Sequence, residues 1–143
     1  MLFAGVNFWI VLVAAVVAWV FGAVWYHLLS AQWIAAQGRT REDFQAGMAM
    51  RRGTPAFYAP FALSFIAEFV MAWMLWGIML HTGAFTIRAG LISGALIWFG
   101  FVLTTIAVNN AFSDRKPMLT LIDAGHWLGV LLIMGAVIGA FAS

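Results

Sequence analysis

The chain has 143 residues, of which 65% are hydrophobic and 8% are charged, with a net charge of +2 and no cysteine. Soluble domains are nearer half apolar and a quarter charged, and a chain of this length cannot bury so much apolar surface in water. The composition therefore predicts an integral membrane protein without a soluble domain. The absence of cysteine excludes disulfides and thiolate metal sites. The connections lack the interleaved basic and aromatic residues typical of nucleic-acid binding.

Long uncharged stretches divide the chain into candidate membrane spans. No charged residue precedes Arg39, and farther along only Glu68 and Asp123 stand within such stretches. Each stretch exceeds the roughly 20 residues that cross a hydrocarbon core. We therefore predict an all-α fold, an integral membrane four-helix bundle that forms a single transmembrane domain over residues 1–143. Its helices are expected at about 5–29, 56–80, 87–112 and 118–141.

The connection over residues 30–55 is the only long one expected. Gly38 is suited to end an extension of the first helix, since glycine tolerates the left-handed conformation. Thr40 can cap a new short helix that has acidic residues in its first turn and Arg51 in its last. The apolar edge around Phe44 fits a helix lying on the cytoplasmic membrane surface, and a solvated connector is the alternative.

Basic residues gather at one end of the predicted bundle. The first and third connections hold six of the seven Lys and Arg residues, and Arg88 alone lies at the other end. Because connections rich in Lys and Arg stay in the cytoplasm, we expect both termini on the non-cytoplasmic side of the membrane.

Small residues recur at four-residue spacing in every predicted span. Helix association in lipid depends on close backbone approach and on polar contacts rather than on the hydrophobic effect. The pattern predicts a tight bundle, and it leaves open whether the fourth helix packs internally or forms a dimer. The residues concerned are Ala14, Ala18, Gly22, Pro60, Ser64, Ala72, Gly90, Gly94, Gly125, Gly129, Gly135 and Gly139, with Glu68 in line between Ser64 and Ala72.

Five polar residues form a candidate functional cluster inside the membrane. Glu68 lies midway along the second predicted helix, and Asp123 and His126, three apart, share a face of the fourth. Asn109 and Arg115 lie toward the cytoplasmic edge. Ionisable residues at membrane depth are costly, and each is a candidate functional residue that needs a named partner.

One hypothesis gives this cluster a structural role. In that case Glu68 stays protonated and hydrogen-bonds to His126 or Ser64, while Asp123 pairs with Arg115 or accepts from a nearby asparagine. Polar side chains often join membrane helices in this way, at ~1 kcal/mol per contact.

The alternative hypothesis is a polar path through the bundle. It would run from Arg115 and Asp123, past Asn109, to His126 and Glu68, and Glu and His side chains can transfer protons. Four helices are few for a carrier, so this hypothesis requires an oligomer.

A metal site formed by Glu68, Asp123 and His126 is a third hypothesis, since these ligand types suit a transition metal, but no compact motif supports it. No nucleophile–base pair, phosphate loop or zinc-protease motif appears. We therefore do not expect an enzyme, and the sequence indicates no cofactor.

Three segments together resemble a known family. An Asn at position 7 precedes an apolar helix that ends in Trp-Tyr at 25–26, and the third helix ends in Asn-Asn-Ala-Phe at 109–112. The fourth begins Leu-Ile-Asp-Ala-Gly-His at 121–126. Over nearly the whole chain these features resemble small bacterial membrane proteins of the domain of unknown function 1761 family. The resemblance implies a four-helix protein of the bacterial inner membrane, and no activity, substrate or catalytic residue.

The expected function is that of a structural, accessory or partner-binding membrane protein. The alternative is a small oligomeric transporter or channel-like protein, coupled to protons or ions, that uses Glu68, His126 and Asp123. The expected partners are the lipid bilayer and a second copy or another membrane protein, and not nucleic acid.

Overall fold

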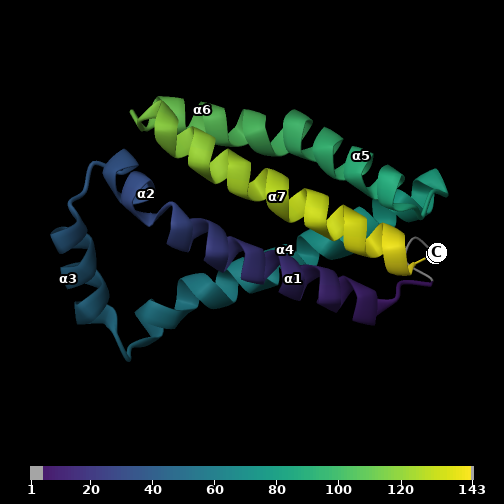
Figure 1. Ribbon diagram of the computed structural model, residues 1–143, viewed down its shortest axis with the longest axis horizontal. Coiled ribbons are helices and arrows are strands. Elements are labelled where there is room, and N and C mark those ends of the chain that lie inside the picture. The colour runs from purple at the N-terminus through teal and green to yellow at the C-terminus, as the bar shows by residue number, and fades with distance from the viewer. Residues whose placement is uncertain (1–4, 143) are drawn as a thin grey trace.

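The computed structural model describes residues 5–142 and consists of helices joined by short connections (Figure 1). Four spans are long and apolar enough to cross a membrane, and the described residues contain no strand. The predicted all-α four-helix membrane architecture is therefore confirmed. The spans are α1 (Phe8–Leu28), α4 (Pro55–Thr82), the composite span α5 (Ile87–Ile97), η1 (Trp98–Leu103) and α6 (Thr104–Phe112), and α7 (Pro117–Phe141).

Local signals set the ends of these helices. Asn7 caps α1, since its side chain accepts hydrogen bonds from the backbone N–H groups of Trp9 and Ile10. This cap explains why α1 begins three residues later than the sequence predicted. The second span begins with Pro55 in its first turn and ends at Thr82, and it is followed by Gly83, whose φ of 65° is left-handed.

The long connection holds two short helices. Helix α2 (Ser30–Ala36) continues the direction of α1 after a break, and Gly38 follows it with a left-handed φ of 73°. Helix α3 (Arg41–Arg51) then begins at Thr40, whose hydroxyl accepts from the backbone N–H of Asp43 at 3.1 Å. The predicted short helix is therefore present with its predicted cap.

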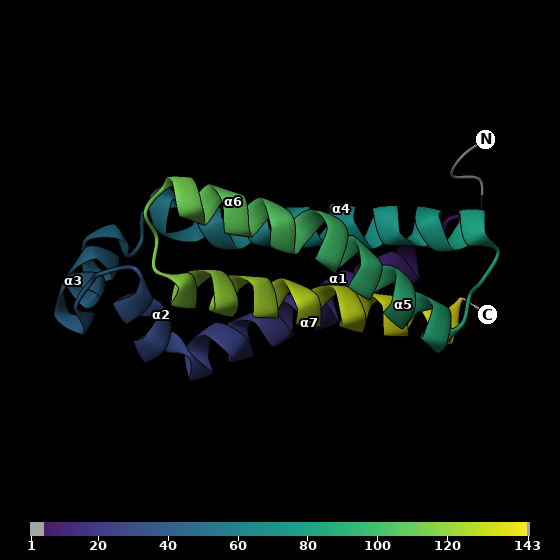
Figure 2. The same cartoon turned by 90° about the horizontal axis from the view of Figure 1, so that it is seen from above.

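Helix α7 is the central element of the bundle. It packs against α1, α4 and the third span, and Figure 1 shows it running between α5 and α1. The core lies along α1, α4 and α7 and consists of Val11, Ala14, Ala15, Ala18, Ala72, Leu75, Trp76, Met79, Val130, Met134 and Ile138. The starts of α1 and α5 and the end of α7 lie at one end of the bundle, and α3 lies at the other (Figure 2).

Glycines bring the backbones of α5 and α7 into direct contact. A Cβ on Gly90 would collide with the carbonyl of Gly135, and a Cβ on Gly135 would collide with that of Gly90. A Cβ on Gly94 would lie 2.6 Å from the carbonyl oxygen of Leu131. The fourth span therefore packs internally through its small residues.

The third span leaves this close packing after α5. Gly90 and Gly94 are its only buried described residues, and the π-helical segment η1 separates them from α6. Two side-chain hydrogen bonds still join the C-terminal half of the span to α7. Trp98 donates to the carbonyl of Ala124 at 2.7 Å, and the amide of Asn110 donates to the hydroxyl of Thr120 at 3.0 Å.

Candidate functional site

The five predicted cluster residues do not form one group. Asp123 and His126 lie together on the first half of α7, surrounded by aromatic residues of α1 and α2. Glu68 is buried separately on α4. Asn109 and Arg115 are exposed, and among the described residues neither side chain makes a hydrogen bond or an ion pair.

Asp123 is held by two aromatic donors from other helices. The hydroxyl of Tyr26 donates to its Oδ1 at 2.8 Å, and the indole N–H of Trp33 donates to the same oxygen at 3.1 Å. The two rings also meet edge to face at 5.4 Å. These donors take the place of the predicted Arg115 or asparagine partner. Asp123 therefore fastens α7 to both α1 and α2.

Two more tryptophans bond to the α7 backbone on either side of Asp123. The indole of Trp25, from α1, donates to the carbonyl of Ile122 at 3.1 Å. The indole of Trp98, from η1, donates to the carbonyl of Ala124 at 2.7 Å. These bonds satisfy indole N–H groups that would be costly to leave bare in hydrocarbon. The beginning of α7 is thus joined by side-chain hydrogen bonds to the first and third spans.

His126 lies in an aromatic cage one turn along α7. Its ring stacks on Phe21 at 6.2 Å with an interplanar angle of 7°, and its centroid is 4.9 Å from Tyr26 and 4.8 Å from Trp127. The residue is 5% exposed, and Nδ1 has no hydrogen-bond partner. Its Nε2 lies against α1 at Gly22, where an added Cβ would be 2.7 Å away. Only glycine at this position leaves room for the ring.

Glu68 is the most deeply buried carboxyl group among the described residues. It is 2% exposed, and its Oε2 has no hydrogen-bond partner. The residue points into the same core as Ala72, one turn farther along α4. An unpaired carboxylate in such a place would cost far more than a neutral acid, so we expect Glu68 to be protonated.

The expected contact between Glu68 and His126 is absent, and no hydrogen bond or ion pair joins the two. Trp19 of α1 donates to the hydroxyl of Ser64 at 3.0 Å, which fixes the register of α1 against α4. One turn on from Ser64, this antiparallel register brings Glu68 to the level of Ala15. His126 lies at the level of Gly22, seven residues or ~10 Å away along α1. Ser64 is likewise bonded to Trp19 rather than to Glu68.

Asp123, His126, Tyr26 and Trp33 therefore form a group of polar and aromatic side chains, which we call the polar junction. Among residues 5–142, no group of three His, Cys, Asp or Glu side chains could hold a metal ion. Hydrogen bonds do not connect Asp123 to Glu68. The sequence did not indicate Tyr26 or Trp33 as partners of Asp123, because aromatic residues near span ends are typical of any membrane interface.

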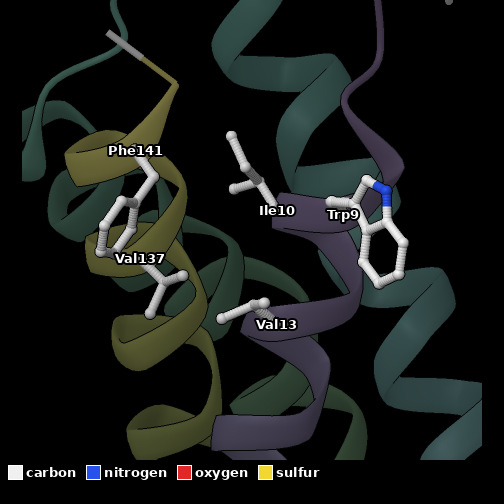
Figure 3. Close-up of a pocket in the computed structure, with 5 residues that line it drawn as sticks. All are labelled: Trp9, Ile10, Val13, Val137 and Phe141. Carbon is white, nitrogen blue, oxygen red and sulfur yellow. The ribbon is translucent and has the colours of Figure 1, made fainter.

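An apolar pocket lies at the opposite end of the bundle, between α1 and α7 (Figure 3). Ile10 and Val13 point across it toward Val137 and Phe141, and Trp9 also contributes to its lining. Its lining offers no ionisable group, so it adds no chemistry to the candidate site.

Comparisons with known proteins identify a family but no characterised relative. No curated protein and no solved structure matches the chain. A family model described as "Protein of unknown function (DUF1761)" matches residues 9–139, which is most of the chain and includes the whole polar junction. The chain therefore belongs to the DUF1761 family of proteins of unknown function.

Proposed function

We propose that the protein is a structural or accessory membrane protein that binds another membrane-embedded helix through the C-terminal half of its third span. The observation that carries this proposal is a set of small residues there without an internal partner. Gly100, Thr104, Ala107 and Ala111 are all exposed, and a Cβ on Gly100 would meet no atom within 4 Å. We call these four residues the α6 stripe.

The α6 stripe has the composition of a membrane helix interface. Thr104, Ala107 and Ala111 are spaced by three and four residues, so they share one helix face. The hydroxyl of Thr104 donates to the carbonyl of Gly100 at 3.0 Å, so its polar group is satisfied within the helix. Small residues allow close backbone approach, which drives helix association in lipid. A second copy of the chain or another membrane protein would supply the facing helix.

The internal use of the other small residues supports this choice. Gly90, Gly94 and Gly135 are occupied at the α5–α7 contact, and Gly22 accommodates His126. The α6 stripe is a comparable surface that remains exposed. The polar junction is consistent with a structural role, because the hydrogen bonds of Asp123 join helices to one another. The proposal includes neither catalysis nor a cofactor.

Larger side chains on the stripe provide the test. We expect the double variant A107L/A111L to fold but to lose its complex, seen as a fall in particle mass in mild detergent and loss of the copurifying partner. The control is V20L/V24L, which enlarges an exposed face of α1. Equal behaviour of the two variants would contradict the proposal.

We further propose that the protein lies in the bacterial inner membrane with both termini outside the cytoplasm. The support is the charge asymmetry, since six of the seven Lys and Arg residues lie at the end that carries α3. A reporter active only in the periplasm, fused to the C-terminus, should be active. Activity of a cytoplasmic reporter at the same position would reverse the orientation.

Glu68 favours a second candidate function, a proton- or ion-coupled carrier acting as an oligomer. The specific observation is its buried carboxyl oxygen without a hydrogen-bond partner. Among the described residues, no hydrogen bond or ion pair holds this carboxyl group in one protonation state. The test is Glu68→Gln, which should abolish pH-driven ion flux in reconstituted vesicles while the protein remains folded. Unchanged flux, or absence of flux in the wild type, would exclude the carrier.

A further inference from the structure

The end of the bundle that carries α3 holds a group of basic side chains without acidic partners. Helix α3 bridges α2 and α4 there, well away from the α4–α5 connection (Figure 1). Its apolar edge is turned to the bundle, since Phe44 meets Trp33 edge to face at 5.9 Å. We define the basic end by its six cationic residues, Arg39, Arg41, Arg51, Arg52, Arg115 and Lys116.

The charges at this end are available for a ligand. The five arginines are exposed, and no ion pair joins them to an acid among the described residues. Three acids lie near this end, Glu42, Asp43 and Asp114. Asp43 accepts a hydrogen bond at its Oδ2 from the hydroxyl of Thr40, the N-cap of α3, at 2.7 Å. Lys116 donates to the carbonyl of Ala35 at 3.0 Å, which ties the start of α7 to α2. The basic end thus carries an unpaired positive charge.

Exposed aromatic and apolar residues stand directly beside these arginines. In the first two turns of α4, which follow Arg52, the exposed rings of Tyr58 and Phe61 each pack against the half-buried ring of Phe57. At the end of the third span, Phe112 is 90% exposed just before Arg115. Tyr58 is the marker among these rings, because tyrosine and tryptophan at a span end are typical of the depth of the lipid headgroups. The arginines are therefore placed level with phosphates rather than out in bulk water.

We infer that the basic end binds the headgroups of anionic phospholipids. Charge complementarity favours a phosphate-bearing ligand, because guanidinium groups bind phosphate oxygens through paired hydrogen bonds. The adjoining apolar rings favour a lipid over a soluble anion, because acyl chains can cover them while the headgroup meets the arginines. Clusters of four to eight basic residues beside a membrane span are typical of such recognition. This inference is independent of the partner proposed for the α6 stripe.

Arg51 and Arg52 are the residues to test, because Arg51 ends α3 and Arg52 follows it, just before the aromatic start of α4. The full chain, in a zwitterionic detergent, is titrated with a short-chain phosphatidylglycerol, and the unfolding midpoint gives an apparent affinity. Short-chain phosphatidylcholine and inorganic phosphate serve as neutral-lipid and free-anion probes. R51Q/R52Q removes two exposed charges, and R88Q is the matched control at the opposite end.

We expect phosphatidylglycerol to raise the midpoint of the wild type and of R88Q equally. R51Q/R52Q should need about tenfold more of this lipid, or more, for the same shift. Arg41→Gln, at the other end of α3, should give a smaller loss in the same direction. Equal affinity in R51Q/R52Q, or equal protection by phosphatidylcholine, would overturn the inference. Protection by inorganic phosphate to the same extent would also overturn it, in favour of a free-anion site.

Discussion

The imidazole of His126 packs directly against Gly22, where an added Cβ would stand 2.7 Å from Nε2. This contact brings α1 and α7 together at the level of the aromatic cage. It also makes Gly22 a positioning residue for the polar junction, because the same ring touches Tyr26, which holds Asp123.

Replacement of Gly22 by alanine should therefore displace His126. We expect the free energy of unfolding to fall by ~1–3 kcal/mol, the usual cost of overpacking, measured by reversible denaturant titration in detergent micelles. Gly100→Ala is the matched control, since a Cβ there meets nothing within 4 Å. The effect of Gly22→Ala should shrink in a His126→Ala background, and an undiminished effect would place its cause elsewhere.

The α5–α7 contact should tolerate substitution less than the Gly22 site. A Cβ on Gly90 meets the backbone of Gly135, which cannot rotate away as a side chain can. We expect Gly90→Ala to reach or exceed the upper end of the ~1–3 kcal/mol range in the same titration. A loss no larger than that of Gly100→Ala would mean that the two helices do not touch at these glycines.

The Tyr26 hydroxyl should stabilise the protein through Asp123. Tyr26→Phe should lower the free energy of unfolding by ~0.6 kcal/mol, the average for such bonds between membrane helices, and by at most ~1.7 kcal/mol. The same change in an Asp123→Leu background should cost much less. Tyr58→Phe provides the control, because the chain has only two tyrosines and the Tyr58 hydroxyl makes no hydrogen bond among the described residues.

Glu68 should behave differently from a structural polar residue. Glu68→Leu replaces the buried carboxyl group, whose Oε2 lacks a partner, with an apolar side chain of similar size. It should raise the free energy of unfolding by up to ~1–3 kcal/mol. Ser64→Ala, one turn away, removes the bond from Trp19 and should lower it. Destabilisation by Glu68→Leu would show that the carboxyl group has a stabilising partner. Stabilisation would mean that Glu68 lowers the stability of the wild-type protein, which favours a functional role and hence the carrier candidate.

Much of the fold followed from local features of the sequence. Apolar stretches long enough to cross a bilayer predicted the spans. Within the long connection, Gly38 predicted the end of the extension of the first helix and Thr40 the start of the short helix. These signals are local, because length, charge and capping chemistry act within a single helix. The same kind of signal explains why α1 begins after Asn7.

The partners of the polar residues could not be predicted in this way. Periodicity tells which residues share a helix face, and it does not tell which neighbour that face meets or in what register. The register fixed by Trp19 and Ser64 separates Glu68 from His126, although each residue lies deep in its own span. The α6 stripe was missed for a related reason. Its residues follow ordinary helical spacing, but the sequence does not tell which face of a span stays without an internal neighbour.

The most direct test of the proposed function is site-specific photocrosslinking in native membranes. A benzophenone amino acid is placed at Ala107 on the α6 stripe or at Val24, an exposed position on α1 near the same end of the bundle. The proposal predicts a protein adduct of defined mass from position 107 and none from position 24, with the mass showing whether the partner is a second copy. Lipid adducts alone at position 107, or the same protein adducts from both positions, would contradict it.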